Sequence, residues 1–312
     1  MSTISLHAFK NRLTVLQTIK EIFSIDNHLT FTAGRNSMTV AEIANDHAEA
    51  MISLEGGHVM NFVPQNQEPL LWLSDFMPMD ANKAIRGGIP ICWPWFGIHP
   101  TDSTKPAHGF ARITPWIVKG TKALENGATQ INFGLKANEN TIKLWPYKFQ
   151  ALLTITIGSE LKIELMTRNT GNESFTLTQG LHSYFNVSDV RQVTVDGLEN
   201  CEYLDAADNW QRKQQSGKIT ISGETNRVYL DTTADCVIED PGFNRKIRIA
   251  KAGSKSTVVW NPWVETAARF GDFGYEGYLN MLCVETTNIG DDAIILAPGE
   301  EHCLQTLISI EN

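Results

Sequence analysis

Residues 149–166 read FQALLTITIGSELKIELM and carry the alternation of side chains that is typical of β-strands. Leu161, Ile163 and Leu165 alternate with other residues, and successive side chains of a strand point to opposite faces. Further apolar runs predict strands at residues 129–137, 175–187, 218–222, 246–249, 256–260, 278–285 and 293–296. Clusters of Gly, Asn, Asp and Ser separate these runs, which predicts an antiparallel, mostly β architecture.

Two short helices are expected beside the strands. Near the start of the chain, apolar residues recur at helical spacing in a polar segment, at Val15, Ile19, Ile22 and Phe23. A second helix is predicted after Asn261 and Pro262, an N-cap residue followed by proline, and Gly271 can end it. Because no linker, repeat or change of composition interrupts the chain, we expect one domain over residues 1–312, with residues 1–30 as a peripheral N-terminal extension.

The bulk composition disfavours several classes of protein. With 42% hydrophobic and 20% charged residues, the chain can bury a large core. Its 26 basic and 35 acidic residues give a net charge of −9, which argues against nucleic acid or an anionic membrane as a partner. No apolar stretch approaches the ~18 residues of a membrane span and no secretory signal is recognisable, so we expect a cytoplasmic protein, and a monomer.

Motifs for metals and nucleotide cofactors are missing from the sequence. The five cysteines are widely spaced without a C-x-x-C pair, which indicates reduced core thiols and not a disulfide or zinc framework. The sequence also lacks H-E-x-x-H, G-x-S-x-G, Walker A and G-x-G-x-x-G motifs. We therefore expect no metal and no cofactor, and an acid–base reaction fits the chain best.

Residues 86–97, RGGIPICWPWFG, form the first candidate binding segment. Three aromatic residues, two prolines and three glycines in this segment predict a shaped loop in place of a regular strand or helix. Glycine lets the backbone approach a ligand, and Arg86 can bind a carboxylate or phosphate through two parallel hydrogen bonds. The alternative is a packed aromatic turn whose arginine pairs with a surface carboxylate.

A histidine and an arginine follow in residues 108–112, HGFAR. In a strand, residues four apart share a face, so His108 and Arg112 could line the same wall of a binding site. The competing interpretation gives both residues only local, structural hydrogen bonds.

Residues 175–185, FTLTQGLHSYF, predict a strand with one apolar and one polar face. The alternation puts His182 and Tyr184 on the polar face, together with Thr176 and Thr178. Side-chain donors and acceptors beside an aromatic ring suit a hydroxyl-rich ligand, so this face could bind a sugar. Alternatively, His182 simply faces the solvent.

Residues 278–285, YLNMLCVE, predict a central strand, because apolar residues occupy both of its faces before it ends at Glu285. Partial burial would raise the pKa of this carboxyl group, whereas a nearby arginine would keep it ionised. Either setting makes Glu285 a tunable proton acceptor. The alternative is an ordinary strand-end glutamate in water.

The order of these motifs resembles a known family. RGGIPICWPWFG, HGFAR, LHSYF, VWNPW and CVE followed by APGE occur in the order of the hexose-6-phosphate mutarotases, the glucose-6-phosphate 1-epimerase branch of the aldose 1-epimerase superfamily. The resemblance spans roughly residues 50–310. It implies a galactose-mutarotase-like antiparallel β-supersandwich with a few short helices and a sugar cleft on one sheet.

The resemblance assigns the chemistry to two residues. His182 would be the general acid that protonates the ring oxygen O5, and Glu285 would be the general base that takes the proton from the C1 hydroxyl. The ring opens, the aldehyde carbon rotates about the C1–C2 bond, and the ring closes on its other face with the two roles exchanged. The implied enzyme is an isomerase that interconverts α and β anomers.

Four further residues would bind the substrate, a D-hexose 6-phosphate for which glucose 6-phosphate is expected. Arg86 and Arg112 match the arginines that hold the 6-phosphate in the family. His108 matches a position beside the sugar hydroxyls, and Asp205 matches an acidic sugar-binding position. Because the phosphate lies away from the reacting carbon, the arginines are expected to affect KM most.

Three alternative functions stay open at this point. A mutarotase of unphosphorylated aldoses would not need two arginines. A non-catalytic carbohydrate-binding β-sandwich would stack sugar on aromatic residues such as Trp93, Trp95 and Trp260. A cupin-like metalloenzyme is disfavoured by the missing ligand spacing.

Overall fold

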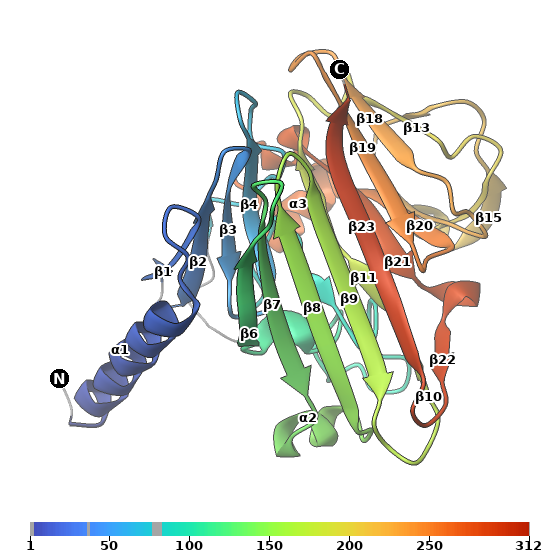
Figure 1. The fold of residues 1–312 in the computed structure, drawn as a ribbon. Coiled ribbons are helices and arrows are strands. Elements are labelled where there is room, and N and C mark those ends of the chain that lie inside the picture. Colours follow the sequence, from blue (N-terminus) through green and yellow to red (C-terminus); the bar gives the residue numbers. More distant parts are fainter. Residues whose placement is uncertain (1–2, 36–37, 77–82, 312) are drawn as a thin grey trace.

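The structure is a computed structural model that describes residues 3–35, 38–76 and 83–311, with side chains described from residue 13 onward. Its strands form sheets of four, eight and nine strands and a two-stranded ribbon (Figure 1). The paired strands of every sheet run antiparallel. This confirms the predicted mostly β, antiparallel fold class.

The nine-stranded sheet contains the hairpin that residues 149–166 predicted. β8 and β9 pair along their whole length, with Phe149 opposite Asn169 and Ile157 opposite Leu161. Every second residue of β8 is buried, so one face of this strand joins the core. In spatial order the strands are β16 (Ile219–Thr220), β13 (Thr194–Asp196), β18 (Cys236–Asp240), β19 (Arg245–Ala252), β23 (Glu301–Glu311), β9 (Leu161–Asn169), β8 (Phe149–Ile157), β7 (Thr129–Lys136) and β6 (Ile117–Ala123).

The eight-stranded sheet is apolar on both faces. Val259 and Val284 belong to the main core, which also contains the apolar face of the nine-stranded sheet, whereas Val258 and Cys283 belong to a second apolar cluster. The strand order is β15 (Gln211–Gln214), β14 (Glu202–Asp205), β17 (Thr225–Tyr229), β20 (Ser256–Asn261), β21 (Met281–Asn288), β11 (Gln179–Leu181) and β5 (Ile91–Cys92), and β12 (Tyr184–Asn186) also pairs with β21.

Two predicted strands differ from the observed ones. The run at 175–187 is split among β10 (Phe175–Leu177), β11 and β12, because β10 pairs with β22 (Ile294–Leu296) while the other two pair with β21. The run at 278–285 begins as a 3₁₀ helix (Gly277–Asn280), and β21 continues past Glu285 to Asn288 with every residue buried. Glu285 is therefore in the middle of a central strand and not at its end.

The N-terminal sheet did not stand out in the sequence. It contains β1 (Leu29–Ala33), β2 (Thr39–Ala44), β3 (Ala48–Ser53) and β4 (His58–Pro64) in that order. The helix α1 (Thr3–Phe23) projects from it (Figure 1) and is longer than predicted. The carbonyl oxygen of Phe23 accepts a hydrogen bond of 2.7 Å from Thr121 on β6, which ties the end of the helix to the nine-stranded sheet.

Two more helices complete the described fold, α2 (Glu139–Leu144) and α3 (Trp263–Phe270). The latter confirms the helix predicted after Asn261, whose Oδ1 accepts a hydrogen bond of 2.9 Å from the Trp263 amide. Gly271 ends it at φ 70°, a conformation that favours glycine. Within the described residues, no helix combines the length and the apolar character that crossing a bilayer would require.

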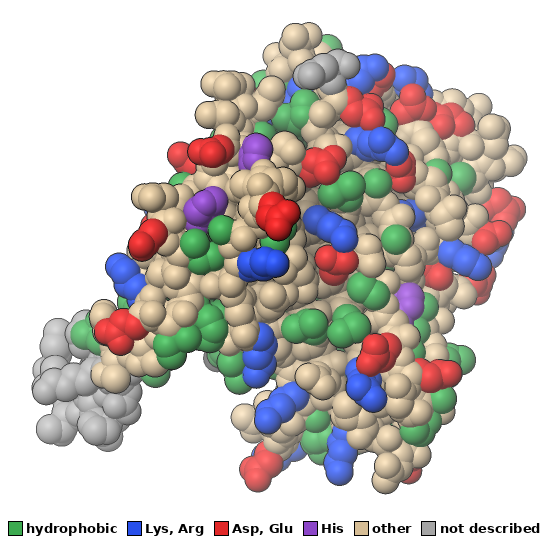
Figure 2. Space-filling view, viewed as in Figure 1, with side chains coloured by type: hydrophobic (Ala, Val, Ile, Leu, Met, Phe, Trp, Pro, Cys, Tyr) green, Lys and Arg blue, Asp and Glu red, His purple; other side chains and the backbone are tan. Residues whose placement is uncertain are grey.

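Acidic and basic side chains are interspersed on the face viewed in Figure 2. Ion pairs form on the nine-stranded sheet, for example between Lys246 and Glu239 at 3.0 Å. A cavity of about 750 Å³ lies between the end of α1 and the first strands, where Lys20, His28 and Glu42 line it. It contains none of the residues that the sequence proposed for chemistry or binding.

Candidate active site

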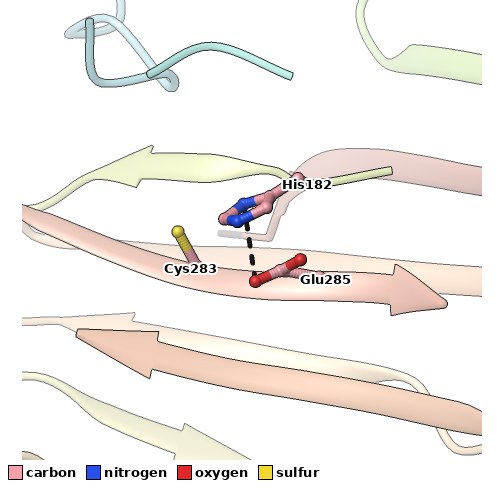
Figure 3. A group of neighbouring side chains, drawn as sticks. All are labelled: His182, Cys283 and Glu285. Carbon is pink, nitrogen blue, oxygen red and sulfur yellow. Dashed lines mark ion pairs between the residues drawn. The ribbon is translucent and has the colours of Figure 1, made fainter. Parts of the chain in front are cut away.

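His182 and Glu285 lie side by side although they are far apart in the chain. β11 and β12 both pair with β21, with Leu181 opposite Thr286 and Tyr184 opposite Cys283. Continued through the gap between β11 and β12, this register puts His182 opposite Glu285. Nδ1 of His182 is 3.4 Å from Oε1 of Glu285 (Figure 3).

The pair is buried. His182 is 7% exposed and Glu285 is 1% exposed, which excludes both the solvent-facing histidine and the glutamate in water. Nδ1 of His182 and Oε2 of Glu285 have no hydrogen-bond partner within the described part of the chain. A buried polar atom without a partner costs about 1–3 kcal/mol, so these atoms are available to a ligand that satisfies them.

Burial sets the protonation states of the two residues. It lowers the pKa of His182 well below its ordinary value, and the neighbouring cationic groups, His108 when protonated and the charged Arg112 and Arg86, lower it further. Burial also raises the pKa of Glu285 well above that of an ordinary carboxyl group. Without a ligand, the pair therefore favours a neutral imidazole and a protonated carboxyl group, and the carboxyl group holds one proton that the imidazole can accept.

Aromatic rings hold the His182 imidazole in place. The Tyr184 ring stacks on it with centroids 4.7 Å apart and planes 8° apart. Trp260 meets it edge-on at 5.9 Å, and the Phe96 ring lies 6.2 Å away. Trp93, Trp95 and Trp260 are 0%, 4% and 9% exposed, so all three tryptophans that a carbohydrate-binding module would use are buried.

Arg86 lies near the pair, and its charge is compensated. Its Nε is 3.1 Å from Oδ2 of Asp272, and its Nη1 donates a hydrogen bond of 3.2 Å to the Tyr184 hydroxyl. The guanidinium also lies over the rings of Phe270 and Phe273, 4.6 and 5.2 Å from their centroids. Tyr184 thus connects Arg86 to the imidazole on which it stacks.

His58 supports the turn that carries Arg86, a role that the sequence did not suggest. Its Nε2 donates a hydrogen bond of 2.7 Å to the carbonyl oxygen of Gly87. Burial lowers the pKa of His58 to about 4, so the ring is neutral. Gly88 has φ 62°, and a Cβ there would be 2.3 Å from the carbonyl oxygen of Val59, so this turn requires glycine.

His108 also approaches the pair, but its segment is not the strand on which the shared-wall argument depended. His108 has φ 60°, and residues Ala111–Ile113 form a 3₁₀ helix. The imidazole is 5.5 Å from that of His182 between ring centroids. Burial and the charges of the two arginines lower the pKa of His108 to about 3. Because Nδ1 of this neutral ring accepts from the Gly97 amide at 3.4 Å, its Nε2–H remains a donor.

Arg112 differs from Arg86 in having no compensating carboxylate. Its Nη2 donates to the carbonyl oxygen of Ala107 at 2.7 Å, while its buried Nε has no partner among the residues described. It also takes part in none of the ion pairs that the described side chains form. Arg112 is thus a cation near His182 and His108 whose charge an anionic ligand could balance.

Asp205 lies apart from these residues. Its strand, β14, is three positions from β21 in the sheet. Register across β17 and β20 puts Leu204 in the same row as Glu285 and Asp205 in the row of Val284, on the other face. Asp205 instead forms an ion pair of 2.8 Å with Lys213.

Cys283 adds a thiol beside the pair. It lies two residues before Glu285 and therefore on the same face of β21 (Figure 3). One ligand atom from each of His182, Cys283 and Glu285 lies within 4.8 Å of the other two. Among the described residues, this is the group that could hold a metal ion.

Comparison with solved structures first gives the class of protein. A crystal structure from Salmonella typhimurium, provisionally described as a mutarotase, matches with a TM-score of 0.86 and 31% identity over 93% of this chain and 96% of that one. The supersandwich that the resemblance implied is thus the observed fold, and the class is that of the sugar epimerases.

The family follows from the sequence comparisons. The family model described as aldose 1-epimerase matches residues 39–309, and this chain belongs to that family. It is 37% identical over 247 residues to a protein of Salmonella typhimurium, covering 78% of this chain and 82% of that one. It is 34% identical over 268 residues to a protein of Escherichia coli, covering 85% and 89%. Both relatives are provisionally named glucose-6-phosphate 1-epimerase. The protein is therefore an isomerase with epimerase activity on a sugar.

Proposed function

We propose that the protein interconverts the α and β anomers of a D-hexose 6-phosphate, with glucose 6-phosphate as the expected substrate. The observation that carries the proposal is the buried pair of His182 and Glu285, 3.4 Å apart. Arg112 supports the proposal that the substrate carries a phosphate, because no ion pair among the described residues balances the charge of this arginine. The names of the bacterial relatives support the same substrate.

Substrate binding prepares the pair for proton transfer. In the free enzyme burial favours the neutral forms, whereas the reaction needs an imidazolium and a carboxylate. A phosphate beside Arg112 and Arg86 cancels charges that lower the pKa of His182. A sugar hydroxyl that donates to the unpaired Oε2 of Glu285 stabilises the carboxylate. The proton that the pair already holds can then move to the imidazole without exchange with solvent.

The charged pair then opens the ring. Glu285 takes the proton from the C1 hydroxyl while His182 gives its proton to O5, so that the C1–O5 bond breaks and an aldehyde forms. After rotation about C1–C2, His182 takes the proton back from the O5 hydroxyl while Glu285 gives its proton to the carbonyl oxygen, and the ring closes on the other face. Positioned acids and bases contribute on the order of 10²- to 10⁴-fold each to such reactions.

The remaining polar groups bind and orient the substrate. Arg112 binds the phosphate directly, and Arg86 adds the guanidinium edge that Asp272 and Tyr184 leave free. His108 donates its Nε2–H to a sugar hydroxyl. These contacts are the same before and during ring opening, so they contribute uniform binding and act mainly on KM.

Exchange NMR on glucose 6-phosphate, with and without the protein, tests the proposal because it measures the exchange of anomers directly. We expect faster exchange, and we expect the same protein to be much slower on glucose. Arg112→Ala should remove this preference, whereas Arg248→Ala, which alters a surface arginine paired with Asp235, should keep it. Equal rates on both sugars would indicate a mutarotase of unphosphorylated aldoses. Binding without faster exchange would indicate a carbohydrate-binding module.

A further inference from the structure

The geometry points to a zinc site formed by His182, Cys283 and Glu285, and to inhibition of the sugar reaction when zinc occupies it. The three ligands are an imidazole nitrogen, a sulfur and a carboxylate oxygen, which are the donor types that Zn²⁺ prefers. The inhibition rests on the proposed function, whereas the binding of zinc does not.

The distances are close to those of a zinc site. With Zn²⁺ bonds of about 2.0–2.3 Å in a tetrahedron, ligand atoms are about 3.5 Å apart. His182 Nδ1 and Glu285 Oε1 are already 3.4 Å apart, and the group as a whole lies within 4.8 Å. The ligand atoms therefore need to approach one another by at most about 1.3 Å to reach this spacing. Three protein ligands leave the fourth position for water, as in open zinc sites.

Buried polar atoms without hydrogen-bond partners are a second, independent indication of a metal site. His182 Nδ1 is buried and has no hydrogen-bond partner within the described residues, and neither does Glu285 Oε2. Both residues are more than nine-tenths buried. A metal ion would satisfy a nitrogen lone pair and a carboxylate that are otherwise desolvated without a partner.

The two arginines do not exclude a cation, because the bound group stays neutral. Zn²⁺ displaces one proton from the Cys283 thiol and one from the Glu285 carboxyl group, and both protons leave to solvent. The Zn–S and Zn–O bonds replace the S–H and O–H bonds, and the imidazole supplies its Nδ1 lone pair with its hydrogen on Nε2. Two positive charges enter and two leave, so the repulsion from Arg86 and Arg112 does not grow.

Zinc in this position withholds both proton carriers from the sugar. Nδ1 of His182 and the carboxylate of Glu285 would be metal ligands, so the imidazole could not become protonated at Nδ1 and the carboxylate could not accept the proton of the C1 hydroxyl. Zinc and sugar phosphate therefore compete for one site.

Cobalt(II) is the probe for binding, since its bond to a thiolate gives a charge-transfer absorption band that histidine and carboxylate sites lack. We expect this band in the wild-type protein, with stoichiometric displacement by Zn²⁺. Cys283→Ser should abolish it, and Cys236→Ser, which alters another buried thiol on a different sheet, should keep it. If Cys283→Ser does not fold, as judged by circular dichroism, Cys283→Ala replaces it. A missing band in the wild type, or an equal band in the Cys283 variant, would overturn the site.

Anomer exchange on glucose 6-phosphate tests the inhibition. Zn²⁺ should lower the rate of anomer exchange by the wild-type protein, and a chelator should restore that rate. A higher concentration of sugar phosphate should raise the zinc concentration that gives half-maximal inhibition. Loss of a residue that only hydrogen-bonds to a metal ligand costs about 10- to 100-fold in metal affinity. Loss of the Cys283 ligand itself should therefore raise the zinc concentration for half-maximal inhibition by more than about 100-fold. The rate of each variant is compared with its own rate without zinc. Full turnover with cobalt bound would refute the inhibition. If the protein does not act on sugar phosphates at all, the cobalt spectra still decide the metal site.

Discussion

The site has a sheet half and a loop half, and they are built differently. The sheet half, His182 and Glu285, lies where strands pair with β21, and both residues are almost completely buried. The loop half, Arg86, His108 and Arg112, lies on turns and a 3₁₀ helix, and His108 has a positive φ. The first half is fixed by the pairing of strands, and the second is fixed by hydrogen bonds of turns together with individual side-chain contacts.

This difference assigns different tasks to the two halves. Proton transfer needs atoms held to within about 0.5 Å, which a paired central strand provides. Recognition of the substrate can vary more freely on loops, because changing a loop does not disturb the core. We therefore expect substitutions in the sheet half to act on turnover and those in the loop half to act on affinity.

The largest effect is expected from the sheet half. His182→Asn or Glu285→Gln should each lower kcat by about 10²- to 10⁴-fold with little change in KM. Because the two residues act as a unit, the double variant should be hardly slower than the worse single variant. Exchange NMR at saturating glucose 6-phosphate gives the rates, and Glu239→Gln, on the far side of the nine-stranded sheet, serves as a control. A single variant that turns over at nearly the normal rate would refute the assignment.

The second effect compares the two arginines of the loop half. Arg112→Ala should raise KM for glucose 6-phosphate about 10- to 100-fold, since a hydrogen bond to a charged group contributes about 1.5–3 kcal/mol. The double variant Arg86→Ala/Asp272→Asn removes Arg86 together with its partner and leaves the net charge unchanged. It should raise KM for glucose 6-phosphate only a few-fold. Initial rates of anomer exchange against substrate concentration give KM for both variants. A greater loss in the double variant would make Arg86 the main phosphate ligand.

Local patterns made much of the fold predictable from the sequence. The alternation in residues 149–166 identified β8 and β9, and the Asn261–Gly271 punctuation identified α3. The N-terminal sheet was missed, because strands such as β2, TVAEIA, are short and contain small alanines that weaken the apolar pattern. The break between β10 and β11 was missed because the partner strands, β22 and β21, come more than 100 residues later.

The site was predictable only as separate residues. The pattern around His182 and the apolar run before Glu285 marked both positions, but their contact depends on the register between β11, β12 and β21. Asp272 and His58 escaped notice, because their roles consist of contacts with Arg86 and Gly87 that no local pattern encodes. Asp205 shows the reverse case, in which a motif suggests a role and the register puts the side chain on the other face.

The third effect links the two halves through pH. The positive charge of Arg112 lowers the pKa of His182, so Arg112→Gln should raise it. Protonating the imidazole while Glu285 also holds its proton leaves the site without a base, which produces the acid limb of the profile of kcat/KM. That limb should therefore move to higher pH in Arg112→Gln and stay in place in Arg248→Gln. A limb that does not move would show that the halves are electrostatically independent.

The smallest effect is expected at Asp205, which the comparison leaves outside both halves. Asp205→Asn should change KM for glucose 6-phosphate by less than about twofold, because the register directs this side chain away from the face that holds Glu285. Its measurable consequence should be at most a small decrease in the free energy of unfolding in urea, since the ion pair with Lys213 is partly exposed and screened by solvent. A tenfold rise in KM at unchanged stability would mean that β14 also contributes to the sugar site. Substrate recognition would then also depend on a strand of the eight-stranded sheet, and the assignment of proton transfer to the sheet and of recognition to the loops would no longer hold.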